Sequence, residues 1–203
     1  MADFSIKPTA GTGNKLIIKD QAGNAVLTTS DAGATLASNV TPDAKQLGVF
    51  EADMWNLTTS FSGDAEPIAS NWERYDYKLH GVKGTGMTQS SGIWTFPSTG
   101  WWNVYFNVQG YYSGDSRYIS PRIKVTDDNA SNWYFGVMNG GFVHGVESGH
   151  SDFGWNCQGV LKIGNVSNDK VRFDVVTNNN SANMTGNADY TTTCAIFIKL
   201  GEI

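Results

Sequence analysis

The chain has 203 residues, of which 12% are aromatic, 16% are charged and 23 are glycine, and its formal net charge is -5. This acidic composition excludes a nucleic-acid partner, because Lys and Arg are not gathered into the clusters that displace phosphate counterions. The apolar runs are only a few residues long, so we expect no membrane partner either, and the length suits one all-β domain with an appendage.

The first predicted segment is residues 1–42, an attachment or stalk region. Gly13, Gly23 and Gly33 are ten residues apart, and blocks beginning at Asp20 and Asp31 each pair a short apolar strand with an Asp/Gly turn. One such unit cannot bury its apolar side alone. Two interpretations stay open: a hairpin extension, or a stalk in which several chains supply each other's missing core.

The second predicted segment is residues 43–203, where tryptophan and tyrosine appear and glycine-containing turns follow about every ten residues. This spacing is typical of an antiparallel sandwich or barrel, so the predicted fold class is all-β. The predicted strands are 47–57, 73–79, 92–96, 100–112, 118–126, 132–138, 157–164, 170–177 and 194–200.

Strand side chains alternate between the two faces of a sheet. In residues 100–112 the even positions from Trp102 to Val108 are apolar, and we expect them to face a core. The odd positions carry Trp101 and Tyr105 among Asn and Gln, which predicts an apolar patch on an outer face. The turn signal before this strand predicts a hairpin with residues 92–96.

The strand predicted at the end of the chain is apolar on both faces. Ile196, Ile198 and Leu200 share one face, while Ala195 and Phe197 share the other. A strand of this kind is covered on both sides, and another copy of the same chain is the simplest cover. We therefore place four residues in a contact between copies: Trp101, Tyr105, Ala195 and Phe197.

Residues 92–106 resemble the signature of the trimeric jelly roll shared by the complement-q globular head and tumour necrosis factor. The matching positions are Gly92, Trp94, Phe96, Pro97, Gly100, Trp101, Trp102, Tyr105 and Phe106. Residues 159–176 and 190–200 are similar to later strands of that family, although Cys194 and Ala195 stand where it has Ser-Gly. The likeness covers residues 45–201 and implies a jelly-roll homotrimer with aromatic residues along its threefold axis.

Residues 11–36 resemble the openings of tailed-bacteriophage virion proteins, especially fibres and head decorations. Together the two resemblances imply a structural virion protein, a trimeric fibre or capsid decoration protein that is located in the virion. Its expected partners are itself and, through residues 1–42, other virion proteins. We expect no enzymatic activity and no cofactor.

His144 and His150 are the candidate metal ligands, since they flank Glu147 and precede Asp152. The His-Glu-x-x-His spacing of helical zinc sites is missing, and the surrounding glycines favour an irregular, solvated loop. We therefore expect no metal site within one chain. One His from each chain at a threefold axis stays open as an alternative.

Host-surface carbohydrate binding is the alternative function, because exposed aromatic rings offer flat platforms for sugars. The candidate platform residues are Tyr111, Tyr112, Trp133 and Trp155. The same rings also fit a core or a contact between subunits. A polysaccharide depolymerase ranks last, because the chain is short and lacks a clear pair of catalytic carboxylates.

Overall fold

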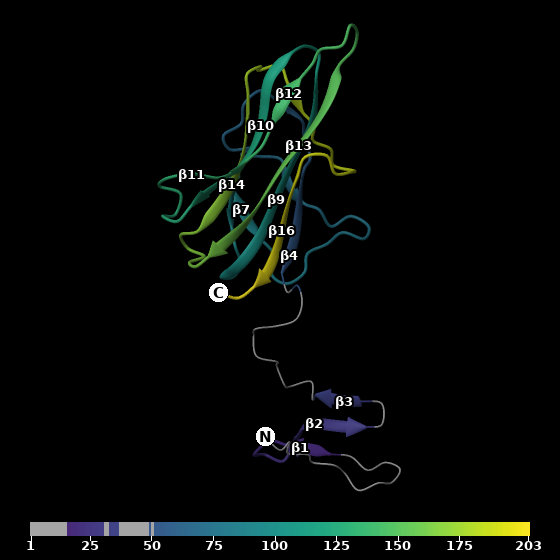
Figure 1. The fold of residues 1–203 in the computed structure, drawn as a ribbon, viewed down its shortest axis with the longest axis vertical. Coiled ribbons are helices and arrows are strands. Elements are labelled where there is room, and N and C mark those ends of the chain that lie inside the picture. The colour runs from purple at the N-terminus through teal and green to yellow at the C-terminus, as the bar shows by residue number, and fades with distance from the viewer. Residues whose placement is uncertain (1–15, 31–32, 37–48, 50) are drawn as a thin grey trace, which may run out of the picture. The chain divides into compact units, whose positions relative to one another are not determined.

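The computed structural model describes residues 16–30, 33–36, 49 and 51–203, which form 16 β-strands (Figure 1). The strands pair antiparallel, as predicted for an all-β sandwich. The described part of the chain has no helix, and so none with the length and apolarity to cross a membrane. Contacts divide the chain into Met1–Gln46 and Leu47–Ile203, a boundary four residues beyond the predicted one at 42.

The N-terminal unit contains a three-stranded antiparallel sheet in the order β1-β2-β3, formed by Ile17–Lys19, Ala25–Ser30 and Gly33–Leu36. Its first turn uses the predicted Asp and Gly. The Asp20 Oδ1 accepts a hydrogen bond from the Asn24 amide at 2.8 Å, and Gly23 has a φ of 88°, which favours glycine. Ile17 and Ile18 are about half exposed, so this sheet leaves apolar surface uncovered within one chain.

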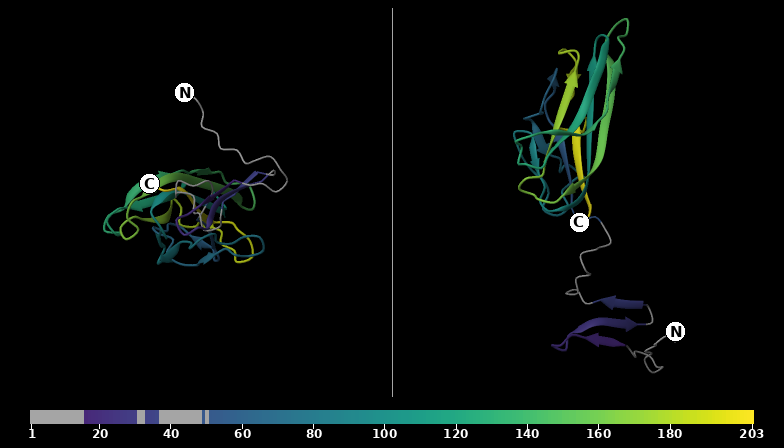
Figure 2. Two further views of the ribbon diagram at one scale, coloured as in Figure 1. Left: turned by 90° about the horizontal axis from the view of Figure 1, so that it is seen from below. Right: turned by 60° about the vertical axis from the view of Figure 1, so that its left-hand side comes forward.

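The head, from residue 51 onward, consists of two antiparallel sheets whose long strands run along its length (Figure 2). One sheet has six strands in the order β11-β10-β14-β8-β7, with β12 also paired to β10. Its strands are β7 (Thr88–Ser90), β8 (Ile93–Thr95), β10 (Ser116–Thr126), β11 (Tyr134–Met138), β12 (Gly141–Val143) and β14 (Lys170–Thr177).

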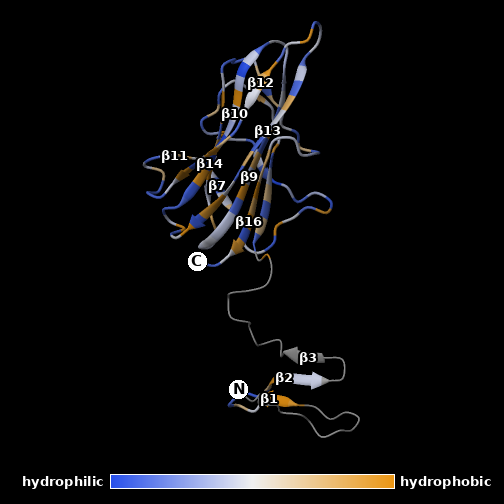
Figure 3. Cartoon of the chain, in the orientation of Figure 1, coloured by the Kyte–Doolittle hydropathy of each residue, from blue (hydrophilic) through white to orange (hydrophobic). Residues whose placement is uncertain are grey.

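The other sheet has seven strands in the order β5-β15-β9-β16-β4-β6, with β13 also paired to β9. Its strands are β4 (Ala52–Leu57), β5 (Phe61–Ser62), β6 (Trp72–Arg74), β9 (Gly100–Tyr112), β13 (Ser151–Ile163), β15 (Asn183–Met184) and β16 (Cys194–Gly201). Hydrophilic and hydrophobic segments alternate along the strands of the head (Figure 3), as expected for sheets with one buried face.

An aromatic core joins the two sheets. Phe106 of the seven-stranded sheet stacks on Phe173 of the six-stranded sheet, with ring centroids 4.7 Å apart. Trp94 and Phe197, also from opposite sheets, lie 5.2 Å apart. These rings are fully buried in the single chain, so each sheet turns one apolar face inward.

The predicted hairpin between residues 92–96 and 100–112 is wrong. Strand β8 pairs with β7 and β14 in the six-stranded sheet, whereas β9 pairs with β13 and β16 in the other. The turn before Gly100 crosses from one sheet to the other. Burial explains this, because Phe96 and Trp102 then meet in the core with ring centroids 5.2 Å apart.

The segment 142–155, predicted to be an irregular loop, is partly regular. Strand β12 ends at Val143, and β13 begins at Ser151, six residues before the predicted start at 157. The glycines do not break β13, because its full length pairs with β9, from Ser151 opposite Tyr112 to Ile163 opposite Gly100. Cross-strand pairing therefore overrides the local preference of glycine for turns.

Candidate assembly surface

Strand β16 lies in the middle of the seven-stranded sheet, between β9 and β4 (Figure 1). Ala195 and Phe197 are fully buried within one subunit, and Phe197 packs in the aromatic core. The prediction that these two residues contact another copy is therefore wrong. Alternation instead turns Ile196 and Ile198 away from the core, where both are half-buried.

Neighbouring strands extend this apolar surface sideways. Ile196 is registered with Tyr105 of β9 on one side and with Met54 of β4 on the other. On the next strand, Gln158 and Val160 of β13 are registered with Tyr105 and Asn103. We call the following residues the outer face: Met54, Trp101, Tyr105, Val160, Ile196, Ile198 and Leu200.

The outer face is exposed in one chain. Trp101 is 42% exposed, Leu200 53% and Val160 58%. An exposed group of large apolar side chains on one sheet face is typical of a surface that another molecule covers. Trp101 and Tyr105 thus lie where the alternation in β9 predicted, on the side opposite the core.

Two amide side chains beside this surface have hydrogen-bond partners within the subunit. The Asn103 Oδ1 accepts a hydrogen bond from Gln158 Nε2 at 2.8 Å, and Asn107 Nδ2 donates to the Thr192 carbonyl at 2.7 Å. Paired amides need fewer new partners when they are covered than free ones do. A partner can therefore cover the outer face and exclude water without leaving these amides unpaired.

Lys162 is registered with Trp101 at one end of the outer face and is its charged neighbour, whereas the phenol and the two thiols nearer its centre are uncharged at neutral pH. Burial raises the pKa of the Tyr105 phenol above its usual value of 10.0. Cys157 and Cys194 are buried free thiols, and burial raises their pKa values to about 12 and about 11. Neither thiol is therefore in the charged form that reacts or binds metal.

The four predicted platform residues do not form one surface. Tyr111 is 40% exposed and lies against His150, with ring centroids 4.7 Å apart. Trp133 lies in the segment between β10 and β11, where the Arg172 guanidinium sits 4.9 Å from its ring centroid. The platform prediction is wrong for Tyr112 and Trp155, because both rings pack against the core.

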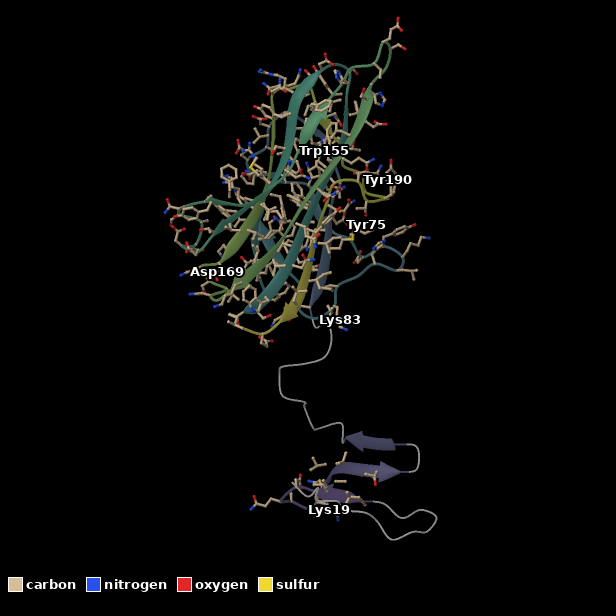
Figure 4. All side chains as sticks on the ribbon, viewed as in Figure 1. Lys19, Tyr75, Lys83, Trp155, Asp169 and Tyr190 are labelled. Atoms are coloured by element: carbon tan, nitrogen blue, oxygen red, sulfur yellow. The ribbon has the colours of Figure 1, made fainter. Side chains whose placement is uncertain are left out.

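Specific contacts fix those two rings. Tyr112 accepts a hydrogen bond at its hydroxyl from Asn179 Nδ2, and its ring packs on the core. Trp155 (Figure 4) fills the space that a side chain at Gly141 would need. Nothing in their spacing distinguishes these rings from exposed ones, since each lies next to a polar or glycine residue.

The two candidate metal ligands form separate polar pairs with different carboxylates. His144 Nδ1 is 3.2 Å from Asp115 Oδ1, and His150 Nε2 is 3.4 Å from Asp152 Oδ1. Within the described residues, no three side chains of His, Cys, Asp or Glu come together as a metal site would require.

No family model matches the chain, and no curated protein matches its sequence. Among solved structures, Eiger TNF from S. frugiperda has a TM-score of 0.58 at 14% identity, over 77% of this chain and 96% of that one. Murine APRIL at pH 5.0 has a TM-score of 0.52 at 12% identity, over 74% and 98%. The head is thus a jelly roll of the tumour necrosis factor type, and at these identities the likeness concerns the fold alone.

Proposed function

We propose that the chain is a structural protein of a tailed-bacteriophage virion, a homotrimer that decorates the capsid or forms a short fibre. The outer face is the observation that carries the assembly part of this proposal. Its residues are apolar and exposed or half-buried in one chain, and no charged residue lies at their centre, which suits contact with an identical subunit.

The sequence resemblance to trimeric jelly rolls favours three copies over two, and the fold agrees with that resemblance. A ring of three requires each subunit to use two different surfaces, since contacts about a threefold axis are heterologous. The outer face would supply one of these surfaces. The virion assignment comes from the resemblance of residues 11–36 to virion proteins, and residues 1–42 would attach the head to other virion proteins.

Light scattering coupled to size exclusion tests the assembly on the full chain. We expect a mass three times the 22.0 kDa of one chain, retained on dilution. A stable monomer would overturn the homotrimer. The virion assignment has its own test: purified particles would contain the chain in multiples of three, and particles without it would contradict the proposal.

In this proposal the protein has no catalytic role. Incubating the purified chain with bacterial surface polysaccharide tests this directly. We expect the amount of reducing ends to stay constant. New reducing ends would instead favour a depolymerase.

A further inference from the structure

An open groove of about 600 Å³ lies on the six-stranded sheet, away from the outer face. It is formed by β10, β12 and the end of β11. Its lining residues are Arg117, Tyr118, Ser120, Arg122, Met138, Asn139, Gly140, Gly141 and Phe142. We call it the arginine groove, because arginines are its only charged members.

An irregularity in strand pairing brings two of these side chains to the groove. The register between β10 and β12 shifts between Ser116 and Ile119, so Arg117 and Tyr118 are both exposed although they are neighbours in sequence. Bulges of this kind redirect side chains and recur at binding sites. Asn178 holds this one in place, because its Oδ1 accepts hydrogen bonds from Ser116 Oγ at 2.9 Å and the Tyr118 amide at 3.2 Å.

The floor of the groove is backbone that leaves no room for side chains. Gly140 has a φ of 149°, and a Cβ there would collide with the Ile119 carbonyl. A Cβ at Gly141 would collide with the Trp155 ring. Asn139 is fixed beside them, since its Nδ2 donates to the Asn156 carbonyl at 2.7 Å. The groove is therefore held open by its own backbone.

The charge of the groove is positive, in a chain whose net charge is -5. None of the lining residues is acidic. Arg117 is exposed and forms none of the ion pairs found among the described residues. Arg122 is 3.6 Å from Glu66, which offsets its charge, and its Nε is buried, so Arg117 supplies the uncompensated positive charge of the groove. The exposed Arg117 guanidinium therefore retains donors for an anion.

Apolar rings complete the site. Tyr118 is 43% exposed and Phe142 is 65% exposed, beside Met138 at 55%. Flat rings next to guanidinium groups suit a ligand that combines an apolar face with a carboxylate. A sugar acid has both, because the C–H bonds on one side of its ring pack on an aromatic face while its carboxylate accepts paired hydrogen bonds from Arg.

We propose that the arginine groove binds a carboxylated saccharide, of the uronic acid class. An extended acidic peptide cannot pair with the strand beneath the groove. Strand β10, beneath the groove, is hydrogen-bonded to β14 on one side and to β11 and β12 on the other. It therefore offers no free strand edge to a peptide backbone. This proposal goes beyond the assembly role and does not depend on it, since the outer face lies on the other sheet.

Saturation-transfer NMR on the full chain tests the proposal with sodium D-glucuronate, and with D-glucose as the neutral match. We expect transfer to glucuronate and none to glucose. Arg117→Gln should weaken binding about tenfold or more, because a charged hydrogen-bond donor is lost. Phe142→Ala should weaken it about threefold or more, because a stacking ring is lost.

Lys83→Gln is the matched control, because it removes one positive charge from an exposed site outside the groove (Figure 4). It should leave glucuronate binding unchanged, and all three variants should keep the wild-type mass in light scattering. Equal transfer to glucose, or full binding by Arg117→Gln, would overturn the proposal. So would a hexaglutamate peptide that binds where glucuronate does not, since the occupant would then be an acidic peptide.

Discussion

Asp128 shows how one carboxylate organises a turn between two strands. Its oxygens accept hydrogen bonds from Asn132 Nδ2 at 2.7 Å, the Asn132 amide at 2.9 Å and Thr126 Oγ1 at 2.7 Å. These bonds lower the pKa of Asp128 from 3.8 to about 2. These hydrogen bonds stabilise the turn between β10 and β11.

The lowered pKa predicts a pH dependence of stability. Because the folded state favours the ionised form, the contribution of Asp128 is complete above pH 3.8 and is lost as the pH falls toward about 2. Asp128→Ala should lower the urea midpoint at neutral pH, and the difference from wild type should shrink in that acidic range. Asp127→Ala, at the exposed neighbouring position, is the control. A difference as large at pH 2 as at neutral pH would contradict this account.

The two thiols give a second prediction at the same scale. Cys157 and Cys194 are buried, and their raised pKa values of about 12 and about 11 keep them protonated at neutral pH. The native chain should react with dithionitrobenzoate far more slowly than the urea-unfolded chain, which should release two equivalents. Rapid reaction of the native chain would show that a thiol is accessible.

Strand β16 is the element on which core and assembly meet, and its two faces predict different consequences. Phe197 is fully buried among aromatic rings, so Phe197→Ala removes core contacts and leaves a cavity. We expect a loss of about 3–5 kcal/mol in the free energy of unfolding. Chemical denaturation measures it, and a loss below about 1 kcal/mol would contradict the core position.

The opposite face of β16 should affect association instead. Ile196→Lys places a charge at the centre of the outer face, where a covered ammonium would lack a partner. We expect a monomeric mass with an unchanged circular dichroism spectrum. Thr88→Lys adds the same charge on exposed β7 of the other sheet and should keep the wild-type mass. An oligomeric Ile196→Lys variant would show that the outer face is not the interface.

Strands β9 and β16 also show which side-chain orientations could be predicted from the sequence. In β9, Asn103, Asn107 and Gln109 mark one face as polar, so alternation places Trp102 and Trp101 on the correct sides. In β16 the one charged residue, Lys199, wrongly suggests that its own face is exposed. Lys199 lies on the core side, where its Nζ donates to Ser98 Oγ at 3.1 Å and Glu202 Oε1 at 2.7 Å. A buried lysine with paired hydrogen bonds cannot be recognised from its neighbours in sequence.

The arginine groove was beyond sequence reasoning for a related reason. Its shape depends on the register shift between Ser116 and Ile119 and on the crowding of Gly140 by a carbonyl of β10. Both arise from pairing between strands whose register no local pattern fixes. The jelly roll itself was predictable, because strand spacing and the motif from Gly92 to Phe106 are local features of the chain.

Across the whole molecule, the two sheets of the head would have separate tasks. The seven-stranded sheet carries the apolar outer face, and the six-stranded sheet carries the arginine groove. If both proposals hold, one trimer presents three grooves. Three weak sites on one trimer bind a polysaccharide more tightly than one site does, provided that the polysaccharide can occupy all three at once.

The division of the chain at Gln46 gives the last prediction. All outer-face residues lie within Leu47–Ile203. A shortened protein without residues 1–46 should therefore still be a trimer, with three times the mass of one shortened chain. Its thermal midpoint should rise with protein concentration, because association that favours the folded state is linked to stability by mass action. Ile196→Lys in the same shortened chain should make the midpoint independent of concentration. If the shortened chain stays monomeric while the full chain is a trimer, residues 1–46 drive the assembly and the outer face does not.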